Sequence, residues 1–161
     1  MYSVERISVV RLPDGQDLAS LFSDLVRLET ELWDVVDVRL RLDHDLALSW
    51  FESMQVIDST PSCRVIDISE ALSITVGGTS KLVDRIEHAG WCERSPNPDD
   101  GRSSTIALTR AGRRLLTAAK RTLDHEIGVR LGEPLSTSEL QRFAATVHTL
   151  RAHVDEQRRS T

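Results

Sequence analysis

Apolar side chains recur at spacings of three and four residues along most of this chain, which is the period of an amphipathic α-helix. The longest such stripe runs from Leu18 to Leu40 with charged residues between its members, and it predicts a helix of about 25 residues. A helix of that length is long for a chain of 161 residues, and an apolar stripe on it is typical of a surface that faces another subunit. A second helix is predicted over 46–58, where the run Asp58–Pro61 stops it.

Residues 65–90 predict two short helices joined by a tight turn at Ser73–Thr75. Asp67 or Ser69 is expected to cap the first of them, and a very short strand is expected over 63–65, just before it. The apolar residues expected on the inner face of the second helix are Val76, Leu82, Val83 and Ile86. Two helices joined in this way form a helix-turn-helix.

A β-hairpin is predicted next, with strands over 91–95 and 104–108 and a turn-rich loop with a positive tip between them. A helix is then expected over 109–131, where Gly132–Pro134 break it, and the last helix begins at a capping box, Ser136–Glu139. A helix-turn-helix followed at once by a hairpin is a winged helix. The predicted fold class is therefore mainly α (α+β), a winged helix-turn-helix with N- and C-terminal helices suited to dimerisation.

Composition narrows the class of protein. No apolar run is long enough to cross a membrane, and the first 16 residues lack the unbroken apolar core of a secretory signal. The two cysteines are too few for a disulfide scaffold and fit a reducing, cytoplasmic setting. The five histidines are scattered without a metal-ligand spacing, and no nucleophile-elbow, P-loop or dinucleotide-binding motif occurs. We therefore expect no enzyme activity, no metal and no cofactor.

Charge is divided unevenly along the chain. The net charge is −5, yet residues 63–122 hold ten Lys or Arg against seven Asp or Glu, whereas the remainder holds ten against eighteen. An acidic protein is a poor general coat for nucleic acid. The positive balance nevertheless falls on the predicted helix-turn-helix and hairpin, which is the segment suited to a polyanion. A chance split of this small size is the competing interpretation.

Three pieces of sequence occur in an order that is informative as a set. Residues 80–90 read SKLVDRIEHAG, residues 100–102 read Asp-Gly-Arg, and residues 108–112 read Leu-Thr-Arg-Ala-Gly. Together they resemble the MarR family of bacterial winged-helix transcription regulators, whose wing carries a D-x-R pattern. The likeness extends over nearly the whole chain after about residue 17, and it leaves the first 16 residues unexplained.

The resemblance implies a homodimer that binds double-stranded DNA at a palindromic operator and represses transcription until a small aromatic or acidic effector, or an oxidant, releases it. The chain then divides into an N-terminal arm (1–16), a helical dimerisation region (17–45 and 123–161) and a winged helix-turn-helix DNA-binding domain (46–122). A winged-helix module that contacts proteins through its acidic surface, without reading DNA, is the alternative. The operator, the effector and the direction of control cannot be deduced from these residues.

The second helix of the helix-turn-helix carries the first group of candidate DNA contacts. Short polar side chains near its start would fit the major groove, and Thr75, Thr79, Ser80 and Lys81 are placed for this. Gly77 and Gly78 would let the backbone approach the duplex closely, or they loosen the turn before the helix. Arg85 would reach a phosphate, or it pairs with Asp84 or Glu87.

The hairpin carries the second group of candidate contacts. Arg102 follows a glycine at the loop tip, where a cation can enter the minor groove. The resemblance implies that Asp100 orients this guanidinium through a charge-assisted bond, and a plain Asp-Gly turn is the other interpretation. The residues expected to contact the DNA backbone are Arg94, Ser103 and Ser104.

The resemblance also implies an effector cleft between the dimer helices and the DNA-reading part. The residues on segments that would line it are Trp33, Arg39, Trp50 and Phe51, and a place in the core or on the surface is the favoured alternative for each. Cys63 and Cys92 lie on candidate strands of one small sheet and could sense oxidants, although apolar packing is the commoner fate of cysteine. The residues expected at the dimer interface are Leu18, Leu21, Leu25, Leu131, Leu135, Leu140, Phe143, Val147 and Leu150.

Overall fold

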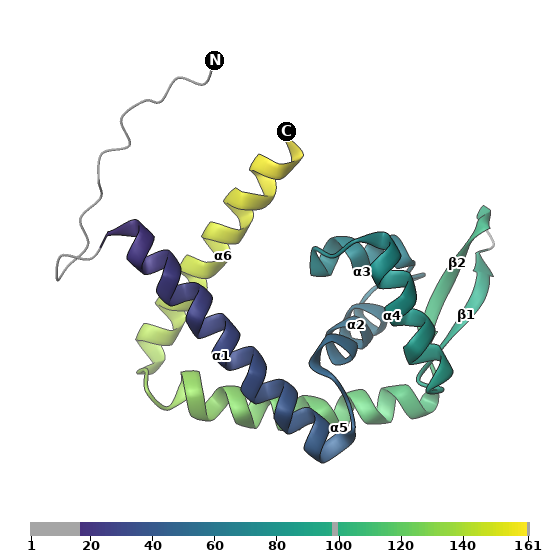
Figure 1. Cartoon of the computed structure of the whole chain (residues 1–161), viewed down its shortest axis with the longest axis horizontal. Coiled ribbons are helices and arrows are strands. Elements are labelled where there is room, and N and C mark those ends of the chain that lie inside the picture. The colour runs from purple at the N-terminus through teal and green to yellow at the C-terminus, as the bar shows by residue number, and fades with distance from the viewer. Residues whose placement is uncertain (1–16, 98–99, 161) are drawn as a thin grey trace.

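The computed structural model describes residues 17–97 and 100–160, with side chains for 17–97 and 103–160. The arm expected over 1–16 lies outside these residues. Helices dominate, and a two-stranded antiparallel sheet forms the wing, which confirms the predicted fold class. Figure 1 shows α2, α3, α4 and the wing gathered at one end of the long helix α5, while α1 runs across the other half of α5 and α6 follows from that end.

Helix α1 (Leu18–His44) has the position and the length that its apolar period predicts. The carboxylate of Asp17 caps it by accepting from the Ser20 amide at 2.8 Å, and Asp45 ends it in the left-handed conformation with φ 50°. Only Val36 and Leu40 of this helix are buried. The stripe therefore packs inside the chain over its C-terminal part alone.

Asp37 joins α1 to helix α2 (Leu48–Ser59). One of its carboxylate oxygens accepts from the Leu48 amide at 2.7 Å, and the other accepts from Arg41 Nε at 2.6 Å. Burial opposes ionisation of Asp37, but the bonds from Arg41 and Leu48, with the charge of Arg41, hold its pKa below the usual value. This carboxylate fixes the corner between the two helices.

Helices α3 (Val65–Leu72) and α4 (Val76–His88) form the predicted helix-turn-helix, but α3 begins earlier than expected. The strand expected over 63–65 is absent, and the Cys63 carbonyl accepts a single bond from the Ile106 amide at 2.7 Å. Arg64 is the N-cap of α3. The two expected caps therefore serve otherwise: Asp67 accepts from the Arg64 amide at 2.8 Å, and the Ser69 hydroxyl donates to the Ile74 carbonyl at 2.7 Å across the turn.

Strands β1 (Cys92–Asn97) and β2 (Asp100–Leu108) make a longer wing than the sequence predicts. The antiparallel register runs from Cys92 opposite Leu108 to Pro96 opposite Ser104, and an irregularity then brings Asn97 opposite Asp100. Proline is tolerated here because the strands of a two-stranded ribbon are both edge strands. The turn residues thus belong partly to the strands.

Helix α5 (Arg110–Ile127) continues into one turn of π-helix, η2 (Gly128–Gly132), close to the predicted end. Thr109 caps α5 by accepting from the Gly112 amide at 3.0 Å, as predicted, and its hydroxyl donates to the Gly90 carbonyl at 2.8 Å. A Cβ on Gly112 would lie 2.0 Å from the Trp91 carbonyl oxygen. Only glycine therefore allows α5 to pack against the start of the wing.

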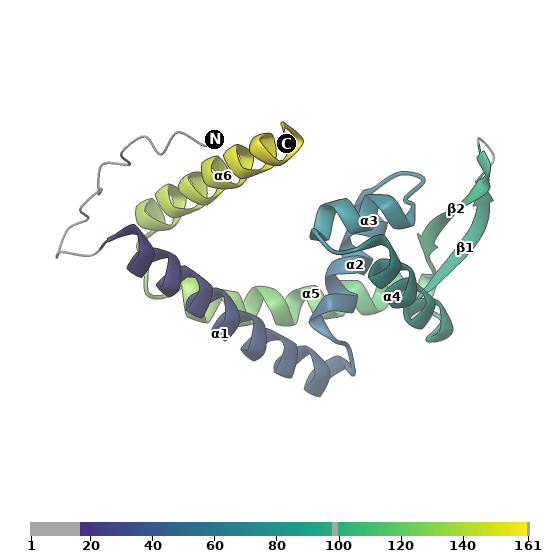
Figure 2. The same ribbon diagram turned by 45° about the horizontal axis from the view of Figure 1, so that its top comes forward.

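Helix α6 (Thr137–Arg159) begins at the predicted capping box, where the Ser136 amide donates to Glu139 at 2.9 Å. All buried side chains of the described residues lie within 36–119, which we call the winged body. Residues 18–35 and 120–159 contain none, and we call them the helical extension. Figure 2 shows the first half of α1 lying away from the winged body, whereas α6 runs back toward it, and Arg158 Nη1 donates to the Ser73 hydroxyl at 3.3 Å.

Candidate nucleic-acid interface

The first turn of α4 projects beyond the core of the winged body. Its N-cap, Thr75, accepts from the Gly78 amide at 3.2 Å. Val76 is 49% exposed and the preceding Ile74 is also exposed, so the inward position expected for Val76 was wrong. Burial begins only one turn later, because the first turn has no neighbouring element to cover it. An exposed apolar group here could contact a thymine methyl, a role that the sequence analysis missed.

Thr79 is not available to a ligand, in contrast to the expectation. It is fully buried, and its hydroxyl donates to the Thr75 carbonyl at 3.0 Å. It shares the inner face of α4 with Val83 and Ile86, at the three- and four-residue spacing of a packed helix. Thr79 therefore helps to hold the helix in place and belongs to the core.

Gly77 and Gly78 lie within the first turn of α4 and do not loosen the turn before it. A Cβ added to Gly77 would meet nothing within 4 Å, so packing inside the chain does not require a glycine there. Lys81 is exposed on the outer side of the same helix and Ser80 is half-buried. The start of α4 thus combines bare backbone, a hydroxyl and a cation.

Arg94 connects the wing to α4 and is not a free cation. Its Nη1 lies 2.7 Å from a carboxylate oxygen of Asp84 and 2.7 Å from one of Glu87, and its amide donates to Glu87 at 3.0 Å. The side chain is 24% exposed. Two acidic residues of α4 thus hold Arg94 and fix the base of the wing, and the contact with the DNA backbone expected of Arg94 stays a prediction.

Arg85 is exposed and makes no ion pair among the described residues, because Arg94 takes the two carboxylates expected to pair with it. It lines a hollow of about 510 Å³ together with Arg41, Trp50 and Trp91. The rings of Trp50 and Trp91 meet edge to face with centroids 5.5 Å apart. Arg85 is thus available for a phosphate.

The tip of the wing is only partly described. The backbone of Asp100 and Arg102 belongs to β2, but their side chains lie outside the described residues. Ser103 is half-buried and accepts from Asn97 Nδ2 at 2.9 Å, whereas Ser104 is exposed. Of the two serines, Ser104 is the one whose side chain faces solvent.

The four residues expected to line an effector cleft do not meet in one place. Phe51 is fully buried in the core, Trp50 packs against Trp91, and Arg39 pairs with Asp43 at 3.0 Å. Trp33 alone of the four lines a groove of about 440 Å³ between α1, α2, α5 and α6. The residues that line the groove are Leu25, Leu28, Glu29, Leu32, Trp33, Val36, Leu48, Glu52, Leu123, Ile127, Phe143 and Val147.

Glu52 is a member of this groove that the sequence analysis missed. It stands four residues after Leu48 on α2, and this helical spacing next to an apolar face is the signal that would have identified it. Burial and then the negative charge of Glu29 raise the pKa of Glu52. A poorly solvated carboxylate therefore faces a mostly apolar groove.

The two cysteines lack the surroundings of a reactive thiol. Both are buried and free, and burial raises the pKa of each to about 11. Arg64 and Arg94 oppose this only in part. A redox-active cysteine requires a lowered pKa and access to solvent, so the redox role considered for Cys63 and Cys92 disagrees with their setting. Cys63 also lies in a loop and not on a strand.

Within the described ranges, no helix is long and apolar enough to cross a membrane. The same ranges contain no group of three or more histidine, cysteine or acidic side chains placed to hold a metal ion.

Comparisons with known proteins agree with this geometry. A family model described as "MarR family" matches residues 48–104, which cover the helix-turn-helix and most of the wing. The "Multiple antibiotic resistance protein MarR" of Escherichia coli K12 is 24% identical over 96 residues, which are 60% of this chain and 67% of that protein.

Solved structures extend the likeness to the whole fold. Sco3205, a MarR family transcriptional regulator from Streptomyces coelicolor in complex with DNA, superposes with a TM-score of 0.77 at 18% identity and covers 84% of this chain and 90% of its own. CouR from Rhodococcus jostii RHA1, bound to p-coumaroyl-CoA, gives 0.72 at 21% identity over 81% and 90%. Residues 48–104 thus match the MarR family of transcriptional regulators, and the chain as a whole shares the fold of these solved members.

Proposed function

We propose that this protein is a homodimeric, cytoplasmic transcriptional repressor that binds a palindromic operator and leaves it when a small molecule binds. The observation that carries the proposal is the exposed start of α4, whose first two turns present Gly77, Ser80 and Lys81. A protruding helix start with short polar groups and a cation suits the major groove. Sco3205, whose fold this chain shares, is described in complex with DNA.

A second copy of the chain is needed to explain the helical extension. No residue of α6 is buried, although its 23 residues include an apolar stripe. Isolated helices are marginal in water, and a stripe of this size is stabilised by burial against a partner. The large exposed apolar residues of the extension that lie outside the groove described above are Leu18, Phe22, Val26, Val129, Leu150 and Val154, whereas Leu25, Leu28, Trp33, Phe143 and Val147 line that groove. Two-fold pairing of two such chains matches a palindromic operator.

The proposed contacts follow from exposure. Thr75, Gly77, Gly78, Ser80 and Lys81 approach base edges in the major groove, and Arg85 contacts a phosphate. In the wing, Arg102 enters the minor groove, Asp100 orients it, and Ser103 and Ser104 contact the DNA backbone. Thr79 and Arg94 support the site from behind, since both are tied into the winged body.

The effector is proposed to bind in the groove between α1, α2, α5 and α6. This groove lies where the helical extension meets the winged body, so a bound ligand would change how the two parts are held together. A ligand can shift such an arrangement only by binding one state more tightly than another. CouR, which has the same fold, is described with a bound acyl-CoA.

Gel shifts with genomic fragments, the protein's own promoter included, test this function. Lys81→Ala should weaken operator binding about fivefold and reduce its salt dependence. Lys120→Ala is the matched control, because Lys120 is exposed on α5 and pairs with Asp124, away from α4. Failure to bind any fragment at low salt would overturn the proposal, and a stable protein partner whose capture is unaffected by Lys81→Ala or Arg102→Ala would point to the protein-contact alternative.

A further inference from the structure

We propose that the groove between α1, α2, α5 and α6 binds a hydrophobic cation, an aromatic or bulky apolar body that carries one positive charge. The inference rests on the proposed function, because it names the chemical class of the effector. It differs from the aromatic or acidic compound that the family resemblance suggested.

The lining of the groove supplies the first argument. Of its twelve residues, ten are apolar and two are the carboxylates Glu29 and Glu52; none is a lysine, arginine or histidine. A volume of about 440 Å³ is within the range of small-molecule sites. An anion placed here would meet two like charges and no cationic side chain among the lining residues. A cation with an apolar body would match both the walls and the charges.

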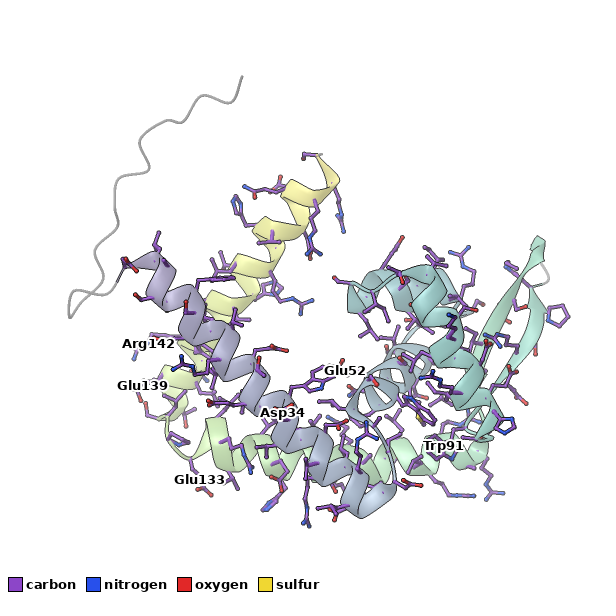
Figure 3. The ribbon with its side chains drawn as sticks, viewed as in Figure 1. Asp34, Glu52, Trp91, Glu133, Glu139 and Arg142 are labelled. Carbon is purple, nitrogen blue, oxygen red and sulfur yellow. The ribbon has the colours of Figure 1, made fainter. Side chains whose placement is uncertain are left out.

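Glu52 supplies the second argument. Figure 3 shows it on the side of α2 that is turned toward α1. Two other acidic residues, one on α1 and one on α5, are paired: Asp37 with Arg41 at 2.6 Å, and Glu126 with Arg130 at 2.5 Å. Among the described residues, Glu52 has no hydrogen bond and no ion pair, and its only recorded charged neighbour is the like-charged Glu29. A bound cation would provide the missing partner.

Trp33 supplies the third argument. It lies on α1 four residues after Glu29, so the ring and that carboxylate share one face of the helix. Its side chain is 37% exposed and lines the groove. The face of an indole ring attracts a cation, and the attraction grows when water is excluded. One aromatic face and two carboxylates around an apolar hollow therefore favour the same ligand charge.

Two ions of matched shape test the charge directly. Tetraphenylphosphonium and tetraphenylborate each carry four phenyl rings on a tetrahedral centre and differ in the sign of their charge. The full-length dimer is titrated with each ion in sodium buffer, and binding is followed by calorimetry and by tryptophan fluorescence. We expect the cation to bind at least tenfold more tightly than the anion, and to weaken operator binding in a gel shift.

Glu52→Gln and Asp34→Asn form the matched pair of variants. Glutamine keeps the shape of Glu52 and removes its charge, and it should weaken binding of the cation about tenfold without lowering stability or operator affinity. Asp34 is exposed on α1 outside the groove (Figure 3), so Asp34→Asn removes the same charge from the surface and should leave binding of the cation unchanged.

Three results would overturn the inference: equal or tighter binding of the borate, an unchanged cation affinity in Glu52→Gln, or no binding of either ion because a second copy fills the groove. Operator binding without ligand is measured separately. A protein that binds its operator but prefers the anion would refute the cation and leave the repressor standing. A protein that binds the cation through Glu52 but binds no DNA fragment would refute the repressor and leave the cation site standing.

Discussion

The winged body and the helical extension are built from the same kinds of residue but bury them differently. In the winged body, apolar side chains from α1, α2, α3, α4, the wing and α5 meet in one core, where Phe51, Met54 and Ile86 are fully buried. In the extension, Phe22 remains 68% exposed and Leu150 56%. One part is closed within a single chain, whereas the other leaves its apolar side chains exposed, as the proposed dimer requires.

This difference assigns two functions to two parts of the molecule: the winged body positions the DNA-reading elements, and the helical extension is proposed to pair two chains. A closed core fixes the positions of α4 and the wing relative to each other, through contacts such as Arg94 with Asp84 and Glu87. In the proposed dimer, pairing through the open apolar surface would set the distance between the two DNA-reading parts. The groove with Glu52 lies between the two regions, where a ligand can affect pairing without disturbing the core.

The largest expected effect is the loss of the core in the winged body. Phe51→Ala removes a fully buried ring from α2 and should lower the free energy of unfolding by about 3–5 kcal/mol. Chemical denaturation should give the same loss in the intact chain and in a monomeric variant, because the ring does not face the extension. A loss below about 1 kcal/mol would contradict a closed core.

The second effect concerns the extension. Leu150→Asp places a charge on the exposed stripe of α6 and should convert the dimer to a monomer in sedimentation, with operator affinity reduced about a hundredfold. Leu42→Asp is the control, since Leu42 is 74% exposed at the C-terminal end of α1, away from α6 (Figure 1). Equal dissociation by both variants would mean that the stripe on α6 is not the interface.

Much of the fold could be predicted from the sequence because long periodic helices carry local signals. The apolar period predicted helices α1 and α6, and the capping box also marked the start of α6. Thr109 marked the start of α5. The ends of the helices were harder to predict where several neighbouring side chains could serve as the N-cap. Asp67 has the chemistry of an N-cap but stands at the third position of α3, because Arg64 already occupies the cap.

The site was harder to predict because exposure depends on neighbouring elements and not on residue type. Val76 has an apolar side chain of the kind that usually packs in a core, but it is exposed. Thr79 has a polar side chain suited to contacting DNA, but it is buried. The ties of Arg94 join residues seven and ten positions away, which no local pattern fixes. Glu52 became informative only when α1, α5 and α6 were placed around it.

A smaller effect is expected at the corner where the two regions join. Asp37→Asn keeps an acceptor for the Leu48 amide but loses the charge that pairs with Arg41, and should cost about 1 kcal/mol at neutral pH. The folded pKa of Asp37 lies below its unfolded value, so its contribution is present above the unfolded pKa and is lost as pH falls through the folded one. Urea denaturation between pH 7 and pH 3 should therefore show the two proteins converging as pH falls. A constant gap would assign the loss to packing and not to charge.

The smallest effect should come from oxidants and thiol reagents. With pKa values near 11, about one thiol in ten thousand is ionised at pH 7, and both Cys63 and Cys92 are buried in the winged body. Hydrogen peroxide should leave operator binding unchanged, and iodoacetamide should label the native protein only as fast as the body opens. The labelling rate then distinguishes the winged body from the helical extension. Phe51→Ala should accelerate labelling, while Leu150→Asp, which opens only the proposed interface, should not. If separating the protomers exposes the thiols as much as damaging the core does, the winged body is not complete in one chain.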